Sequence, residues 1–155
     1  MLRILPGDLD DPRIIALLAT HVAGARAGMP RESAHALDVS GLKASDLVLW
    51  AAWDGDTLAG VGALRAMGPA EGEIKSMHTA QAARRRGVGS ALLRHIIAEA
   101  TARGYGRLYL ETGAIAGFAP ARALYRAQSF VECGPFGPYS PDPVSVFMTL
   151  PLGPA

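Results

Sequence analysis

The sequence predicts a single α/β domain, residues 1–155, built around one mixed β-sheet. Three observations predict it. The apolar segments follow the order β-α-β-β-β-α-β-α-β-β, and short turns join the early strands, which makes those strands antiparallel. The chain of 155 residues contains no linker and no internal repeat, and half of its residues are hydrophobic. That length and composition suit one sizeable core and exclude a disordered chain.

The N-terminal part predicts one strand, one helix and a long loop. The strand LRIL ends at Pro6-Gly7, and Asp10 or Asp11 can cap a helix with Pro12 in its first turn. This helix continues through RIIALLATHVAGARAG, which has one apolar face. The polar segment after it, residues 29–46, reads as a loop that can hold one short helix. We expect this loop to border the substrate, because long loops in compact domains often carry function.

The middle of the chain predicts a three-stranded meander followed by a helix. Strands LVLWAAWD and TLAGVGALRAM flank Asp54-Gly55, a strong hairpin signal because glycine adopts a positive φ without steric cost. The turn GPAEG leads to strand EIKSMHT. After a loop of three arginines, an amphipathic helix runs from about Gly87 to Arg103, and Gly104 ends it as a C-cap.

The C-terminal part predicts one buried strand, one short helix and two closing strands. RLYLET is the buried strand and APARALYRAQ is the helix. FVECG and SVFMTL then close the sheet around a turn rich in proline and glycine.

Charge and cysteine usage exclude several classes of function. The formal net charge of +1 is too small for a protein that coats nucleic acid or an anionic membrane. The single cysteine, Cys133, rules out an internal disulfide framework and a cysteine-rich zinc site, and it reads as a small buried apolar residue. No apolar run approaches a signal-peptide core or the roughly 18 residues of a membrane span. We expect a cytoplasmic protein without a metal.

The only basic cluster lies directly before the central helix. Arg84, Arg85 and Arg86 precede Gly87 and Gly89, and Ser90 follows. A helix start carries unpaired N–H groups and a partial positive charge, so it binds phosphate where a ligand can approach the backbone. Glycine removes the Cβ atoms that block this approach, and guanidinium groups suit phosphate oxygens. The segment predicts a phosphate or pyrophosphate cradle.

Two other nucleotide-binding patterns do not fit. A P-loop needs a Gly-Lys-Ser/Thr triplet, which the chain lacks, and Leu92 occupies the third glycine position of a dinucleotide-binding turn. The spacing alone also permits an ordinary strand–loop–helix turn with solvated arginines.

The segment RRRGVGSALL resembles the acyl-CoA motif R/Q-x-x-G-x-G/A of the GNAT superfamily of N-acetyltransferases. The strand before it, the helix after it, RLYLET and ALYRAQSF all fall where that family places them, so the resemblance covers essentially the whole chain. GEIKSMHTA, LETG, FAPARALY and ECGPFG resemble a bacterial subgroup sometimes labelled indole-acetate acetyltransferase. The resemblance implies a mostly antiparallel twisted sheet of six to seven strands with a splayed central pair, flanked by about four helices.

The resemblance also implies acetyl-CoA as co-substrate and assigns residues to it. The strand end would pair its backbone with the pantetheine arm, and the amides opening the helix would take the pyrophosphate. The residues are Met77, His78, Thr79, Arg84, Arg85, Arg86, Gly87, Val88, Gly89 and Ser90. The family often has Asn where this chain has Phe118, and Gly where it has Ser129.

Acetyl transfer to an amine needs a base, a polarised carbonyl and an acid for the leaving thiolate. Tyr125 matches the family tyrosine near the thioester sulfur and is the expected acid. Glu73 has the spacing of the glutamate base of histone-acetylating members; the alternative is an edge glutamate paired with Arg65 or Lys75. A backbone N–H of Met77 or His78 would hold the carbonyl oxygen.

Two further side chains, His78 and Glu111, bear on the choice of base. His78 titrates near neutrality, but strand alternation places it on the face opposite Glu73. Glu111 reads as a structural acceptor for backbone N–H groups rather than as a catalytic group.

The acceptor pocket is predicted only by position. It would involve the loop 29–45, the strand end at Trp50 to Trp53, and the turn GPFGPYSPDP with Phe136 and Tyr139. In that loop, Arg31, His35 and Asp38 could bind a carboxylate or an amine.

The predicted function is acetyl transfer to an amine of a small molecule or peptide by direct attack on the thioester. The alternatives are a non-catalytic acyl-CoA sensor of the same fold and a different nucleotide-binding protein. Sheet edges also make a homodimer possible.

Overall fold

The computed structural model describes residues 2–26, 39–44 and 46–153. Its helices are α1 (Pro12–Arg26), α2 (Val39–Ala44), α3 (Val88–Ala102) and α4 (Ala119–Ala127). Its strands are β1 (Leu2–Pro6), β2 (Leu47–Asp54), β3 (Thr57–Ala66), β4 (Glu71–Thr79), β5 (Arg107–Gly113), β6 (Val131–Cys133) and β7 (Ser145–Pro151). Single 3₁₀ turns lie at Gln81–Ala83 and Ala116–Phe118. None of the helices within these ranges has the length and apolar character needed to cross a bilayer.

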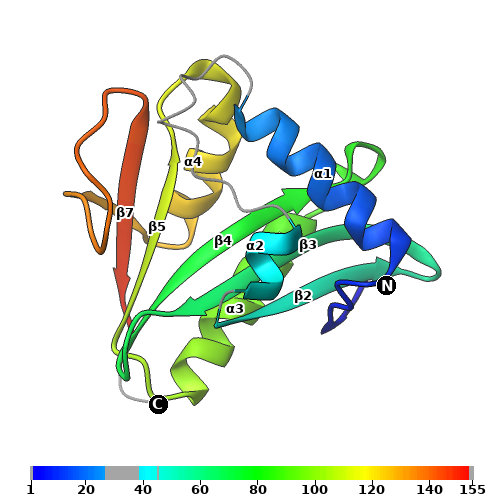
Figure 1. Ribbon diagram of the computed structural model, residues 1–155, viewed down its shortest axis with the longest axis horizontal. Coiled ribbons are helices and arrows are strands. Elements are labelled where there is room, and N and C mark those ends of the chain that lie inside the picture. The colour runs from blue at the N-terminus through cyan, green and yellow to red at the C-terminus, as the bar shows by residue number, and fades with distance from the viewer. Residues whose placement is uncertain (1, 27–38, 45, 154–155) are drawn as a thin grey trace.

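The seven strands form one sheet in the order β1-β2-β3-β4-β5-β7-β6, which confirms the predicted mixed, mostly antiparallel architecture (Figure 1). Every neighbouring pair is antiparallel except β4 and β5. The parallel pair follows from the chain order, because α3 is the crossover between these two strands.

The parallel pair is joined at one end only. Bridges connect Glu71–Ile74 with Arg107–Leu110, and beyond these residues β4 and β5 separate (Figure 1). The expected splayed central pair is therefore confirmed. The separated strand ends, 75–79 and 111–113, leave backbone groups of both strands without a partner on the other.

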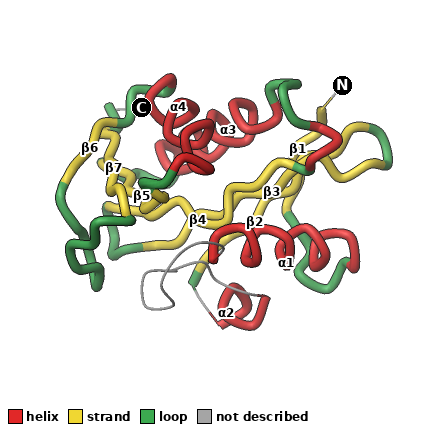
Figure 2. The backbone as a smooth tube through the Cα atoms, turned by 90° about the horizontal axis from the view of Figure 1, so that it is seen from above, coloured by secondary structure: helices red, strands yellow, loops and turns green. Residues whose placement is uncertain are grey.

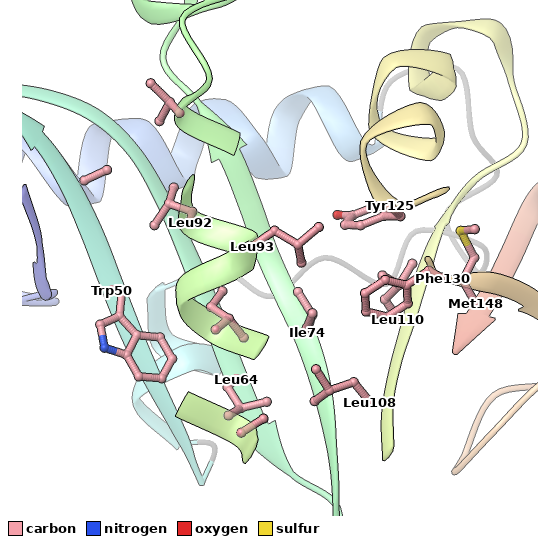
Figure 3. Packing of buried hydrophobic residues seen from close by; sticks show 14 of the residues in the cluster. Trp50, Leu64, Ile74, Leu92, Leu93, Leu108, Leu110, Tyr125, Phe130 and Met148 are labelled. Carbon is pink, nitrogen blue, oxygen red and sulfur yellow. The ribbon is translucent and has the colours of Figure 1, made fainter. Parts of the chain in front are cut away.

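Helices cover both faces of the sheet. α1 and α2 pack on one face, and α3 and α4 pack on the other (Figure 2). The larger core lies on the α3 side, where Leu92, Leu93 and Ile96 contact Ile74 of β4 and Leu110 of β5 (Figure 3). These α3 residues belong to the apolar face predicted from the helical spacing.

Local signals account for the element boundaries. The Asp11 carboxylate accepts a hydrogen bond from the N–H of Arg13 at 2.9 Å, and Pro12 occupies the first position of α1. The β2–β3 turn is Gly55-Asp56 rather than the predicted Asp54-Gly55, with Gly55 at φ 60°. Asp54 instead pairs with Thr57 as the last rung of the hairpin.

A β-bulge in β4 corrects one sequence-based expectation. Val61 pairs with His78 and Ala63 pairs with Lys75, so Gly62 alone faces both Ser76 and Met77. The extra residue shifts the alternation, and His78 therefore shares the α1 face with Glu73. The expectation that these two side chains lie on opposite faces is wrong, because strict alternation assumes an unbulged strand.

Candidate active site

The start of α3 exposes backbone N–H groups. Gly87 is the N-cap residue with φ 77°, and no side chain of the described residues caps the helix. The N–H groups of the first turn have no partner within the helix. Arg84, Arg85 and Arg86 lie exposed just before this turn, and Arg85 has a φ of 66°. The geometry is that of an anion-binding helix start with cations beside it.

The two glycines of the motif have different roles in the fold. A Cβ on Gly87 would meet no atom within 4 Å, so its left-handed backbone, rather than space, explains the glycine. A Cβ on Gly89 would lie 3.1 Å from Cδ2 of Leu124 in α4 and 3.7 Å from Oγ1 of Thr79. Gly89 therefore lets α3 begin close to α4 and to the end of β4.

Tyr125 extends from α4 toward the opening between β4 and β5. Figure 3 shows its hydroxyl directed toward β4 and Leu93, above Leu110 and Phe130. The ring is 7% exposed and makes an edge contact with Phe130 at a centroid distance of 6.0 Å. Burial, and secondarily the nearby Glu111 carboxylate, raises the pKa of the Tyr125 hydroxyl well above its ordinary value.

Glu73 lies on the α1 face and is held by two cations. Its carboxylate is 1% exposed, with Arg65 Nη2 at 3.0 Å from Oε1 and Lys75 Nζ at 3.3 Å from Oε2. The Tyr139 hydroxyl donates a hydrogen bond to Oε2 at 2.6 Å. The structure thus shows the ion-paired glutamate that the sequence left open as an alternative, paired with both cations and on a central strand.

Glu111 lies at the point where β5 leaves β4, on the same face as Glu73. It is half-buried, and desolvation raises its pKa to about 7. The Ser145 hydroxyl and Lys75 offset part of this effect, whereas Glu73 and Asp142 add to it. A carboxyl group that titrates near neutrality is suited to accept a proton at physiological pH.

Two imidazoles lie side by side where α1 packs on β4. Nδ1 of His21 is 3.2 Å from Nδ1 of His78, and the rings meet edge to face. Burial, followed by the proximity of His78, lowers the pKa of His21 to about 4, and burial also lowers the pKa of His78. Burial therefore favours the neutral form of both rings, and a hydrogen bond between the two Nδ1 atoms requires that one of them carries a proton.

The turn before β7 carries an aromatic cluster to this face. Phe136 stacks on Tyr109 of β5 at 4.8 Å and contacts Tyr139 and Phe147 at 5.0 and 5.8 Å. The Tyr139 hydroxyl, which donates to Glu73, accepts a hydrogen bond from Lys75 Nζ at 2.9 Å. Tyr139 and Phe136, which the sequence predicts in the acceptor pocket, thus lie next to Glu73, Lys75 and Tyr109.

Both tryptophans and Cys133 have surroundings other than the charged residues of the α1 face. Trp50 is buried on the α3 face beside His95 and Arg103, remote from the charged cluster of the α1 face. Trp53 stacks under the Arg13 guanidinium at 4.4 Å. Cys133 is half-buried on β6, and desolvation raises its pKa. Arg31, His35 and Asp38 lie outside the described residues.

Two features of this region have little signal in the sequence. His21 reads as one more residue of an amphipathic helix, and only the packing of α1 on β4 brings it to His78. The bulge in β4 is also hard to predict, because serine rather than glycine occupies its left-handed position: Ser76 has a φ of 57°. Among the described residues, no group of three or more His, Cys, Asp or Glu side chains could hold a metal ion.

The fold and this arrangement of residues define an acyltransferase class, and comparison with known proteins gives the family. Residues 18–130 match the model of the acetyltransferase (GNAT) family. A relative from Bacillus subtilis, "Uncharacterized N-acetyltransferase YsnE", is 46% identical over 94% of this chain and 96% of its own length. The "IAA acetyltransferase" of Azospirillum brasilense is 43% identical over 79% of this chain and 80% of its own.

A solved structure agrees with the fold. A GNAT family acetyltransferase from Elizabethkingia anophelis with acetyl-CoA bound superposes with a TM-score of 0.71, covering 97% of this chain and 98% of that one at 20% identity. The chain belongs to the GNAT family of acetyltransferases. It is an N-acetyltransferase of a family that uses acetyl-CoA as the acyl donor.

Proposed function

We propose that this protein acetylates an amine of a small molecule or peptide, and that the amine attacks the thioester directly in the opening between β4 and β5. The carrying observation is that β4 and β5 stop pairing after Ile74 and Leu110, while the released end of β4 at Thr79 lies beside the uncapped start of α3. One opening thus lies beside an anion-binding helix start, a neutral tyrosine and a carboxyl group that titrates near pH 7.

Two parts of the chain are suited to bind an acyl-CoA: the start of α3 and the end of β4. The N–H groups from Arg85 to Ser90, with the three arginines, would hold the pyrophosphate. The backbone of Met77, His78 and Thr79, released from β5, would pair with the pantetheine arm as an added strand would. This assignment rests on unpartnered backbone groups at both places.

Glu111 fits the role of general base better than Glu73. Glu73 is enclosed by Arg65, Lys75 and Tyr139, so an amine would have to displace one of them to reach the carboxylate. Glu111 lies at the opening itself, and its pKa of about 7 allows it to accept a proton directly or through water. We assign Glu73 to holding Lys75 and Tyr139 in place.

Tyr125 acts as a hydrogen-bond donor rather than as a source of protons. Its raised pKa lies far above the roughly 8.5 of a thiol, so a thiolate cannot remove its proton at equilibrium. A hydroxyl directed into the opening can still donate a hydrogen bond to the leaving sulfur and stabilise its charge.

Atoms and protons balance without a further reactant. Acetyl-CoA supplies the thioester carbonyl carbon, to which the amine nitrogen bonds while the carbon–sulfur bond breaks. Glu111 takes the proton that the nitrogen loses and passes it to solvent. The thiolate is protonated from solvent after release.

The acceptor must present a neutral amine near Glu111. An aliphatic amine with a pKa of about 10 is roughly one part in a thousand neutral at pH 7, which is why a base at the opening matters. The half-buried aromatic side chains of Tyr109 and Tyr139 favour an acceptor with apolar surface next to its amine.

The test combines ligand binding with turnover. We expect calorimetric titration to detect CoA but neither ATP nor NAD, and thiol release from acetyl-CoA to depend on an amine. Arg84→Ala should weaken CoA binding about tenfold, less in high salt, whereas Arg94→Ala on the exposed side of α3 should not. Saturable CoA binding without turnover on any amine would instead support an acyl-CoA sensor.

A further inference from the structure

Ser76 is the one buried residue of β4 whose side chain has no structural explanation. It is 7% exposed, and its Oγ makes no hydrogen bond to any of the described residues. A buried hydroxyl without a partner is unfavourable, because it loses its bonds to water and gains none in return. Serine side chains in turns and bulges ordinarily bond to nearby backbone groups, and Ser76 does not.

The backbone of Ser76 makes the serine harder to explain. Its φ of 57° lies in the left-handed region, where glycine, and to a lesser degree asparagine, fits at low cost. A bulge that required only this conformation would be better served by glycine. Both the strained backbone and the unpartnered hydroxyl therefore disfavour serine in the isolated fold, and such strain typically lies at functional sites.

The position of Ser76 relates it to the opening. It is the second residue of β4 after Ile74, the last residue paired with β5. Lys75 before it faces Glu73 and Tyr139, whereas Met77 after it packs near Gly62 and Ile96 on the α3 face. Ser76 thus lies where β4 crosses from the charged face to the core face, at the point where the two strands separate.

We propose that the Ser76 hydroxyl donates a hydrogen bond to the carbonyl oxygen of the acyl group held between β4 and β5. The inference rests on the proposed function and adds a catalytic residue to it. Negative charge develops on that oxygen as the amine attacks, and a prepositioned donor stabilises this charge at little reorganisation cost. The acyl group would supply the acceptor that the hydroxyl lacks.

Two variants separate the hydroxyl from the backbone. Ser76→Ala removes Oγ and keeps a strained residue, whereas Ser76→Gly removes Oγ and relieves the strain. We expect both to lower kcat by about 10–100-fold while CoA affinity stays within about twofold of wild type. Ser76→Gly should also raise the Tm by about 2–4 °C. Even if Ser76→Ala fails to fold, the glycine variant tests the proposal.

A spectroscopic measurement tests the contact itself. With acetyl-CoA labelled with ¹³C at the carbonyl, infrared difference spectra should show a carbonyl band shifted to lower frequency in the wild type and not in Ser76→Gly. Wild-type kcat in Ser76→Gly, or the same band shift in both proteins, would overturn the proposal. Failure of the wild type to bind CoA would instead overturn the proposed function.

Discussion

The two faces of the β4–β5 pair differ sharply, although the same strands build both. On the α3 face, Ile74, Leu108 and Leu110 join a closed apolar core. On the α1 face, Glu73, Lys75 and Glu111 lie within one electrostatically coupled group. Alternate side chains of each strand thus serve different purposes: those on one face stabilise the core, and those on the other form the charged site. The charged side chains become accessible to a ligand where β4 and β5 stop pairing.

The two carboxylates of the α1 face show the same division on a smaller scale. Glu73 lies within the paired part of β4 and faces two cations and a phenol. Glu111 follows the last bridged residue of β5 and has no ion pair of comparable length among the described residues. Cations hold the first carboxylate in place, whereas desolvation leaves the second poised to exchange a proton.

The largest expected effect is the loss of this second carboxylate. Glu111→Gln removes the base but keeps the size and neutrality of the protonated form, so the fold should be retained. We expect kcat/KM for acetyl-CoA to fall by about 10²–10⁴-fold, measured by thiol release at a saturating concentration of the amine. Glu132→Gln, on the exposed surface of β6, is the matched control and should be silent. A Glu111→Gln enzyme with wild-type turnover would place the base elsewhere.

Glu73→Gln should mainly affect stability. The substitution leaves Arg65 and the 8%-exposed Lys75 without their counter-charge, which we expect to lower the free energy of unfolding by about 3 kcal/mol in urea titrations. Replacing the group as a whole, with Arg65→Met, Glu73→Leu and Lys75→Met, should recover most of that loss. If Glu73→Gln kept wild-type stability and lost turnover, Glu73 rather than Glu111 would be the base.

The order and type of the elements were predictable because they depend on short-range patterns. The apolar spacing of α3, the cap at Asp11 and the glycine after α3 each act within a few residues. The family and its donor were predictable from Arg84, Gly87 and Gly89 and the elements around them. The packing role of Gly89 was not predictable from the sequence, because the side chain that a Cβ there would meet, Leu124, belongs to another helix.

The less predictable part of the site depends on contacts between distant elements. A single inserted residue at Ser76 moved His78 to the other face, and alternation alone has no means of detecting it. Glu111 was read as structural because its raised pKa comes from desolvation and from charges on β4 and the turn before β7. Residue type and spacing locate a carboxylate, but only the folded surroundings determine its protonation.

The pH dependence should separate the same two carboxylates. Because the pKa of Glu111 is about 7, the rate per neutral amine should fall about tenfold per pH unit below 7 and level off above it. The free energy of unfolding should decrease as pH rises, because the folded state binds more protons than the unfolded state between pH 4.5 and about 7. The contribution of Glu111 is therefore complete below pH 4.5 and declines as pH rises to 7. Unfolding titrations of wild type and Glu111→Gln across this range should show the difference, and parallel pH curves would contradict it.

The smallest expected effects test the apolar face, where the two motif glycines differ in mechanism. Gly87→Ala should cost about 1–2 kcal/mol because alanine resists a φ of 77°. Gly89→Ala should cost a similar amount because its Cβ would press on Leu124, 3.1 Å away. Leu124→Ala creates room, so it should recover the loss in Gly89→Ala and leave the loss in Gly87→Ala unchanged. A double-mutant cycle in urea measures both couplings. Equal coupling of the two glycines to Leu124 would mean that packing, rather than backbone conformation, determines the start of α3.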